Sequence, residues 1–175
     1  MKLKEEYGFY MRPWLIRNEI PKILIADDNS MMREILRETL TQWGYQVVEA
    51  KDGEEAWEKM QLPDAPRLLL LDWLMPKLDG IALCERIRKQ LKYYPYIIFL
   101  TQVSGSENII HGIEAGADEF LLKPVNFPEL RSRLFAGERI IEYLNVIETQ
   151  KYELQNCQSS LSRLQNMLMI LIKAL

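Results

Sequence analysis

The sequence predicts an α/β fold in which a five-stranded parallel sheet is packed between helices. Three observations support this prediction. Short apolar segments alternate with helix-like segments between residues 21 and 138, and polar residues, several of them acidic, follow the apolar segments. The 175-residue chain is also 48% hydrophobic, which is enough for a buried core.

The five strands are expected at short apolar segments that helical spacing does not explain. They are Lys22–Ala26, Tyr45–Glu49, Arg67–Asp72, Tyr96–Thr101 and Glu119–Leu122. The third segment is the most apolar, because it contains an unbroken run of leucines, and it is therefore predicted at the centre of the sheet.

Apolar residues at helical spacing predict helices between these strands. The first helix is expected after Ser30 as its N-cap and before Gly44. A last helix is expected from Phe127 to the end of the chain, with Gly137 as its only glycine. The residues that indicate the four inner helices are Met31, Ile35, Leu36 and Leu40, then Ala56, Trp57 and Met60, then Ile81, Cys84, Ile87 and Leu91, then Ile109, Ile110, Ile113 and Ala117.

Composition argues against several classes of protein. The formal net charge of -3 argues against a surface made mainly for nucleic acid, and two cysteines, Cys84 and Cys157, are too few for a thiolate metal cage. No signal peptide opens the chain and no apolar segment is long enough to cross a membrane, so a cytoplasmic protein without a membrane partner is expected.

Residues 1–20 are expected to form an aromatic-rich arm before the domain at residues 21–138. Tyr7, Phe9, Tyr10 and Trp14 crowd into this segment. The arm either packs these rings on the main domain or provides a contact for a partner or a second copy, and the sequence leaves both interpretations open.

Five polar residues are placed where predicted strands end. Asp27 and Asp28 follow the first strand, Asp72 and Thr101 end the third and fourth, and Lys123 follows the fifth. Because the carboxyl ends of parallel strands share one edge of the sheet, these side chains are expected to converge. Three close carboxylates repel one another, and Mg²⁺, which prefers oxygen ligands, would relieve that repulsion. A carboxylate beside such an ion can accept a phosphoryl group, whose charge a lysine can neutralise.

The chain resembles the receiver domains of bacterial two-component response regulators over about residues 21 to 140. The resemblance rests on ILIADDNSMMRE, LLLLDWLMPKLDGIALCERIR, FLTQ and GIEAGADEFLLKPVNFPEL, which occur in the family's order and spacing. It implies a flavodoxin-like (βα)5 fold and phosphorylation of Asp72 by a histidine kinase or a phosphotransfer protein. It also implies Mg²⁺ held by Asp27, Asp28, Asp72 and the backbone carbonyl of Leu74, with Asp27 acting largely through water.

The resemblance assigns roles to residues around the acceptor. Lys123 would contact the phosphoryl group, and Pro124 would follow a cis peptide bond. Thr101 and Phe120 would form the switch pair, in which Phe120 turns inward when Thr101 moves.

Two positions depart from the family pattern. Leu74 and Val103 are apolar, whereas the family often has polar groups there that help to position the hydrolytic water. Both residues are therefore expected to tune the rate of phosphoryl loss. An aspartyl-phosphate phosphohydrolase is the alternative from another class, although such enzymes usually place the nucleophile and a second acid two residues apart on the first strand.

Residues 139–175 carry an apolar residue at every seventh position, which is the period of a coiled-coil seam. These residues are Ile140, Ile147, Leu154, Leu161, Leu168 and Leu175. A signalling helix that pairs two chains into a homodimer is expected, and a helix lying on its own domain is the alternative. The near balance of charge in this segment argues against a helix that reads DNA.

The second apolar position of each heptad can be chosen in two ways. One choice gives Tyr143, Gln150, Cys157, Leu164 and Leu171, and the other gives Leu144, Lys151, Gln158, Gln165 and Ile172. The first is more apolar, so isolated tails should prefer it.

A receiver followed by such a helix resembles the front half of receiver-coupled diguanylate cyclases of the GGDEF class. That resemblance implies a cyclase output domain beyond Leu175, in which case the parent protein is an enzyme. A stand-alone signalling or scaffold protein is the alternative.

Overall fold

Strands and helices alternate along the chain in the computed structural model, which describes residues 20–102 and 106–174. The elements are β1 (Lys22–Ala26), α2 (Ser30–Gln42), β2 (Gln46–Ala50), α3 (Gly53–Met60), β3 (Leu68–Asp72), α4 (Gly80–Gln90), β4 (Tyr96–Thr101), α5 (Ser106–Glu114), β5 (Glu119–Leu122) and α6 (Phe127–Ala174). The chain divides into two compact units, residues 1–141 and residues 142–175. The predicted arm aromatics Tyr7, Phe9, Tyr10 and Trp14, and also Val103 and Leu175, lie outside the described residues.

The five strands form one parallel sheet in the order β2-β1-β3-β4-β5. The predicted five-stranded parallel sheet is therefore confirmed, and β3 lies at its centre as expected. All five residues of β3 are buried, because this strand has a neighbour on each side and helices on both faces. The pairing of Asp72 with Leu100 places the end of β3 beside the end of β4.

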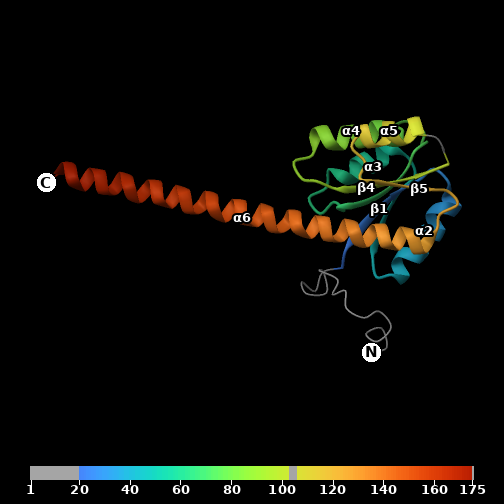
Figure 1. Ribbon diagram of the computed structural model, residues 1–175, viewed down its shortest axis with the longest axis horizontal. Helices are drawn as coiled ribbons and strands as arrows, with labels where there is room; N and C mark the ends of the chain where they lie inside the picture. Colours follow the sequence, from blue (N-terminus) through green and yellow to red (C-terminus); the bar gives the residue numbers. More distant parts are fainter. Residues whose placement is uncertain (1–19, 103–105, 175) are drawn as a thin grey trace, which may run out of the picture. The chain divides into compact units, whose positions relative to one another are not determined.

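Helices cover both faces of the sheet (Figure 1). Side chains alternate along each strand, so Leu69 and Leu71 pack toward α3 and α4, whereas Leu68 and Leu70 pack toward α2 and the first turns of α6. The two faces of the sheet therefore contribute to two separate apolar clusters.

The first helix is confirmed, but two of its details differ from the prediction. Asn29, rather than Ser30, is the N-cap, because its side chain accepts a hydrogen bond from the Met32 amide at 3.1 Å. Leu36 and Leu40 are fully buried, whereas Met31 is 70% exposed and Ile35 is 43% exposed. Side chains one position apart on a helix point in directions that differ by about 100°. Leu36 and Leu40 therefore face the sheet, whereas Met31 and Ile35 do not.

Helix α6 packs closely on the sheet at Gly137. A Cβ at this position would lie 2.5 Å from Cδ1 of Tyr96, so glycine is what permits the close approach. One residue later, the buried Glu138 accepts a hydrogen bond from the Tyr45 hydroxyl. These contacts anchor the beginning of α6, which runs to Ala174 as the predicted long helix.

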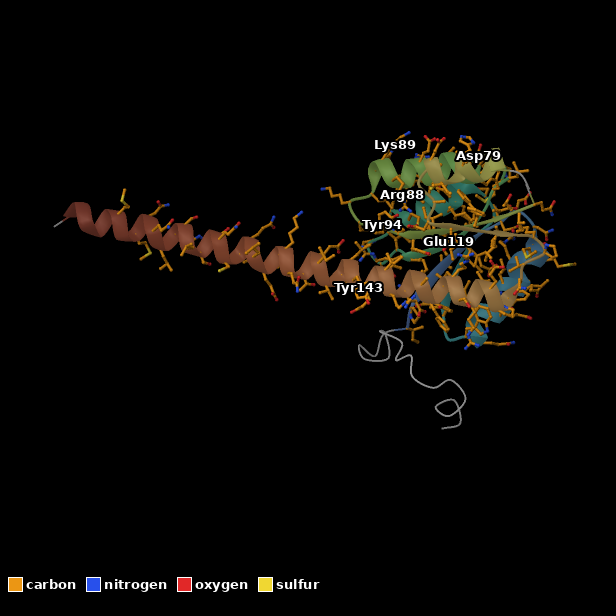
Figure 2. The ribbon with its side chains drawn as sticks, viewed as in Figure 1. Asp79, Arg88, Lys89, Tyr94, Glu119 and Tyr143 are labelled. Carbon is orange, nitrogen blue, oxygen red and sulfur yellow. The ribbon has the colours of Figure 1, made fainter. Side chains whose placement is uncertain are left out.

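A polar contact ties Arg88 of α4 to Asp118, which directly precedes β5; Figure 2 labels Arg88 and its neighbour Tyr94. The Arg88 guanidinium lies 2.9 Å from the Asp118 carboxylate, and it also stacks 4.1 Å from the ring centre of Tyr94. The Tyr94 hydroxyl donates to the same carboxylate at 2.6 Å. This contact lies at the end of the sheet away from the loops that follow the strands.

Candidate functional site

Three aspartates and one lysine meet at the carboxyl edge of the sheet. Asp27 and Asp28 follow β1, Asp72 ends β3, and one carboxylate oxygen from each lies within 4.8 Å of the others. The Lys123 ammonium, just beyond β5, lies 2.8 Å from Asp27 and 2.9 Å from Asp72. The structure therefore brings together the acids and the lysine that the sequence places at separate strand ends.

Burial and neighbouring charges shift the pKa values of Asp72 and Lys123. Asp27 is fully buried and Asp72 is nearly so. Burial, together with the nearby Asp27 charge, raises the pKa of Asp72, although the hydrogen bond from Lys123 opposes the shift. Burial alone would lower the pKa of Lys123, but its hydrogen bonds to Asp27 and Asp72 outweigh this effect and raise the pKa.

The donor set fits a hard divalent cation. Carboxylate oxygens from three residues lie within 4.8 Å of one another, and a single ammonium offsets only part of their charge. Oxygen ligands with excess negative charge are those that Mg²⁺ prefers. A bound cation would also relieve the repulsion between Asp27 and Asp72, which adds to the larger effect of burial in raising the pKa of Asp72.

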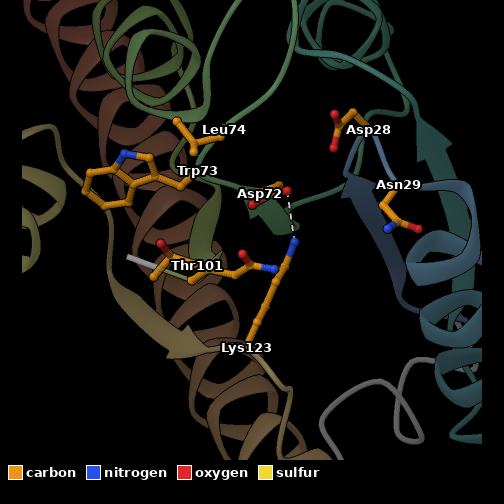
Figure 3. Close-up of a pocket in the computed structure, with 8 residues that line it drawn as sticks. Asp28, Asn29, Asp72, Trp73, Leu74, Thr101 and Lys123 are labelled. Atoms are coloured by element: carbon orange, nitrogen blue, oxygen red, sulfur yellow. Dashed lines mark ion pairs between the residues drawn. The ribbon is translucent and has the colours of Figure 1, made fainter. Parts of the chain in front are cut away.

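A pocket opens above these residues (Figure 3). Its lining residues are Asp28, Asn29, Asp72, Trp73, Leu74, Thr101, Gln102 and Lys123. Leu74 is 64% exposed, so its apolar side chain lies at the mouth of the pocket. Asn29, Trp73 and Gln102 were not predicted from the sequence, although each directly follows a residue that was. The position of Trp73 and Gln102 directly after strand ends, and of Asn29 in the short loop between β1 and α2, is the signal that could have identified them.

The proposed switch residues lie on β4, which neighbours the acceptor strand β3, and on β5, which follows β4 in the sheet. Thr101 is buried, and its carbonyl accepts a hydrogen bond from the Lys123 amide at 2.7 Å, so β4 and β5 end together. Phe120 pairs with Phe99 across the sheet and is half-buried against the core cluster that contains Phe99. The Lys123–Pro124 bond is cis, as the resemblance implies.

The loop after β3 is held tightly against the acceptor strand. The Gly80 amide donates to the Trp73 carbonyl at 2.9 Å, and a Cβ at Gly80 would lie only 2.3 Å from the carbonyl oxygen of Asp72. Asp79 caps α4 by accepting from the Ala82 amide at 2.7 Å (Figure 2). Both ends of the loop that carries Leu74 are therefore fixed by hydrogen bonds, one at Trp73 and one at Asp79.

An ion pair between an exposed lysine and a buried carboxylate supports the same loop from the side of α3. Lys77, whose backbone has a positive φ of 65°, places its ammonium 2.6 Å from the carboxylate of Asp52. Asp52 also caps α3 by accepting from the Glu55 amide at 2.9 Å. The hydrogen bond from Lys77 is the largest of several effects that lower the pKa of Asp52 below its ordinary value of 3.8.

We expect Lys77→Met to lower the free energy of unfolding at pH 7, because it removes the cationic partner of a buried carboxylate. The pKa of Asp52 is depressed in the folded state, so the pair stabilises the protein above pH 3.8 and stops doing so as the pH falls through the folded-state pKa. Urea unfolding of both proteins at pH 7 and pH 3 should give a smaller difference at pH 3. Lys89→Met, which removes an exposed pair with Glu85, is the control and should change little. An equal loss for Lys77→Met at both pH values would contradict the expectation.

Comparison with known proteins gives a consistent result. The profile of the response regulator receiver domain matches residues 23–135. The chain is 43% identical over 113 residues to ycf27 of Cyanophora paradoxa, a probable transcriptional regulator, covering 65% of this chain and 46% of that protein. It is 35% identical over 115 residues to chemotaxis protein CheY1 of Helicobacter pylori, covering 65% of this chain and 93% of that protein. The chain thus spans about half the length of the transcriptional regulators that it matches.

A solved structure is similar in the same region. The chemotaxis protein CheY4 of Vibrio cholerae superimposes with a TM-score of 0.64 at 31% identity, covering 68% of this chain and 99% of that chain.

In the part of the chain that the structure describes, no helix is both long enough and apolar enough to span a membrane.

Proposed function

The chain belongs to the response regulator receiver domain family, and from this premise we propose that it accepts a phosphoryl group on Asp72 from a histidine kinase or a phosphotransfer protein. The observation that supports this proposal best is the position of Asp72, between two further carboxylates and an ammonium at the floor of an open pocket. The domain at residues 21–138 would carry this chemistry, and residues 139–175 would transmit its result.

The residues of the site would divide the work of phosphoryl transfer. A carboxylate oxygen of Asp72 attacks phosphorus, and the bond from phosphorus to the leaving group breaks. Lys123, already 2.9 Å from Asp72, donates to a phosphoryl oxygen, while Asp27 keeps the ammonium in place at 2.8 Å. Thr101, at the end of the next strand, supplies a hydroxyl that can donate to another phosphoryl oxygen. Asp27, Asp28, Asp72 and the Leu74 carbonyl would hold Mg²⁺, which when bound neutralises charge on the transferred group.

The test of this function is phosphorylation by a small donor. Incubation with acetyl phosphate and Mg²⁺ should add one phosphoryl group per chain, measured by intact-mass spectrometry, and a chelator should prevent the addition. Steady turnover of a generic phosphate ester, with no phosphorylated chain accumulating, would instead support the phosphohydrolase alternative.

We expect the phosphorylated form to last for hours rather than minutes. Leu74, at the mouth of the pocket, offers an attacking water no hydrogen bond, and Val103, outside the described residues, is also apolar. Positioned polar side chains contribute about 10²–10⁴-fold to reactions of this kind. Replacing Leu74 by Asn and Val103 by Glu should therefore speed the loss at least about tenfold. Loss of the wild-type label within a minute in clean buffer would contradict this prediction.

We propose that α6 passes the signal on by pairing with α6 of a second chain. The heptad residues whose side chains are described are exposed in the single chain: Ile140, Ile147, Leu154 and Leu161. An apolar stripe of this kind, spaced by seven, is what a coiled coil buries. The output domain is proposed by analogy to be a diguanylate cyclase, and assaying cyclase activity of the parent protein with and without phosphorylation of Asp72 would test that proposal.

A further inference from the structure

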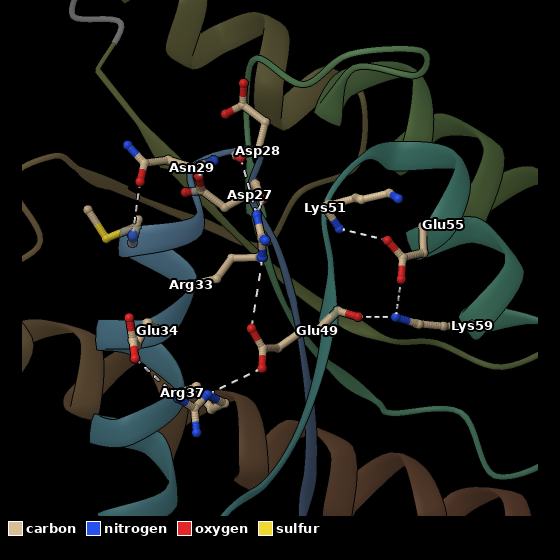
Figure 4. A network of polar contacts seen from close by, with 11 residues as sticks. Asp27, Asp28, Asn29, Arg33, Glu34, Arg37, Glu49, Lys51, Glu55 and Lys59 are labelled. Atoms are coloured by element: carbon tan, nitrogen blue, oxygen red, sulfur yellow. Dashed lines mark hydrogen bonds and ion pairs between the residues drawn. The ribbon is translucent and has the colours of Figure 1, made fainter.

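Arg33 of α2 contacts the loop after β1, which carries Asp27 and Asp28 (Figure 4). A single nitrogen of Arg33, Nη1, donates to the backbone carbonyl of Asp27 at 2.7 Å and lies 3.2 Å from that of Asp28. Nothing in the sequence signals this contact, because Arg33 has the spacing of an ordinary charged residue on a helix surface.

The other side of the same guanidinium is held by β2. Nε of Arg33 lies 3.8 Å from the Glu49 carboxylate, and Nε of Arg37 lies 3.3 Å from the other oxygen of that carboxylate. Glu49 is therefore a shared anchor for the two arginines (Figure 4). Arg33 is the better buried of the two, with 18% of its side chain exposed compared with 44% for Arg37.

We propose that Arg33 is a positioning residue, which orients Asp27 and Asp28 for cation binding by fixing the carbonyls of both residues. The proposal rests on the proposed function, since it concerns the same Mg²⁺ site. Asp27 also closes this loop by accepting from the Asn29 amide at 2.9 Å, so its carboxylate direction depends on the backbone that Arg33 holds. Groups that orient metal ligands in this way commonly affect metal affinity by about 10–100-fold.

The charge of Arg33 makes the proposal easy to test, because positioning and electrostatics predict opposite results. A guanidinium beside a cation site repels the cation, so removing its charge alone should strengthen Mg²⁺ binding slightly. Removing a positioning contact should weaken binding. The sign of the change therefore separates the two roles.

The experiment measures the Kd for Mg²⁺ by isothermal titration calorimetry on the full chain, with thermal unfolding as a check of folding. Arg33→Gln should raise the Kd about tenfold. Arg33→Lys keeps the charge but cannot reach the carbonyls and Glu49 together, and it should also raise the Kd. Arg37→Gln is the matched control: it removes one positive charge from the same helix and a contact with the other oxygen of Glu49 but leaves the loop contacts, so its Kd should stay within about twofold of wild type.

Each outcome has a distinct meaning. A Kd for Arg33→Gln equal to or lower than that of wild type would overturn the positioning role. A wild-type Kd for Arg33→Lys in a folded protein would overturn it as well, and would do so even if Arg33→Gln failed to fold. Absence of Mg²⁺ binding by the wild-type chain would instead overturn the metal site of the proposed function.

Discussion

Asp72→Asn is expected to abolish phosphorylation by acetyl phosphate completely. Asparagine has nearly the same shape as aspartate, so β3 and its buried neighbours should be preserved, but an amide is a poor nucleophile toward phosphorus. Asp72 is also the carboxylate that approaches both the ammonium of Lys123 and the pocket. Intact-mass spectrometry after incubation with donor and Mg²⁺ measures the result directly.

Asp79→Asn is the matched control for this experiment. Asp79 lies on the loop after Asp72 and caps α4 through the Ala82 amide at 2.7 Å. Asparagine caps helices about as well as aspartate, so this variant should fold and be phosphorylated like wild type. Undiminished labelling of Asp72→Asn would show that the acceptor has been assigned to the wrong residue.

The second large effect is expected in the tail, where two polar substitutions should convert a dimer into a monomer. Leu154 and Leu161 are exposed on α6 of the single chain and belong to the heptad seam. Burying a leucine contributes about 1.5–3 kcal/mol, so replacing both residues by Asp in both chains removes several times that amount. Sedimentation of the wild type and of the double variant measures the change.

Ser159→Asp provides the matched control. Ser159 is exposed and lies five positions after Leu154, which places it away from the seam in either choice of heptad. It should leave the dimer intact. A monomeric wild type, both with and without phosphorylation, would rule out the proposed coiled coil.

Cys157 reports which of the two heptad choices the paired tails adopt. It faces its counterpart across the seam in the first choice and lies at the flank in the second, so mild oxidation should cross-link the chains at rates that depend on phosphorylation. Cys84 should not interfere, because it is buried and burial raises its pKa to about 11, whereas Cys157 is exposed. Equal rates at a concentration where both forms are dimers would refute a change of register. Asp72→Asn is the control: if acetyl phosphate changes the cross-linking rate of the wild type but not of this variant, the change depends on phosphorylation of Asp72.

The sequence by itself predicted the architecture because the relevant patterns are local. A run such as LLLLD can be buried on both faces only in an inner strand, and β3 does lie at the centre of the sheet. The presence of a single glycine, Gly137, similarly predicted the long last helix, which extends from Phe127 to Ala174. The candidate acids could be named because residues at the ends of parallel strands share one edge of the sheet.

Only the tertiary structure decided how those residues are held. Lys123 and Asp27 are 96 positions apart in the chain, and Lys77 and Asp52 are 25 apart, so no local spacing relates them. The contacts of Arg33 depend on how α2 is rotated about its axis, the same rotation that buries Leu36 and leaves Met31 exposed. That rotation is set by packing against the whole sheet, because a helix turns whichever apolar face buries the most surface toward the core. Apolar spacing therefore predicted that α2 exists, and packing against the sheet determined that Arg33 reaches the acids.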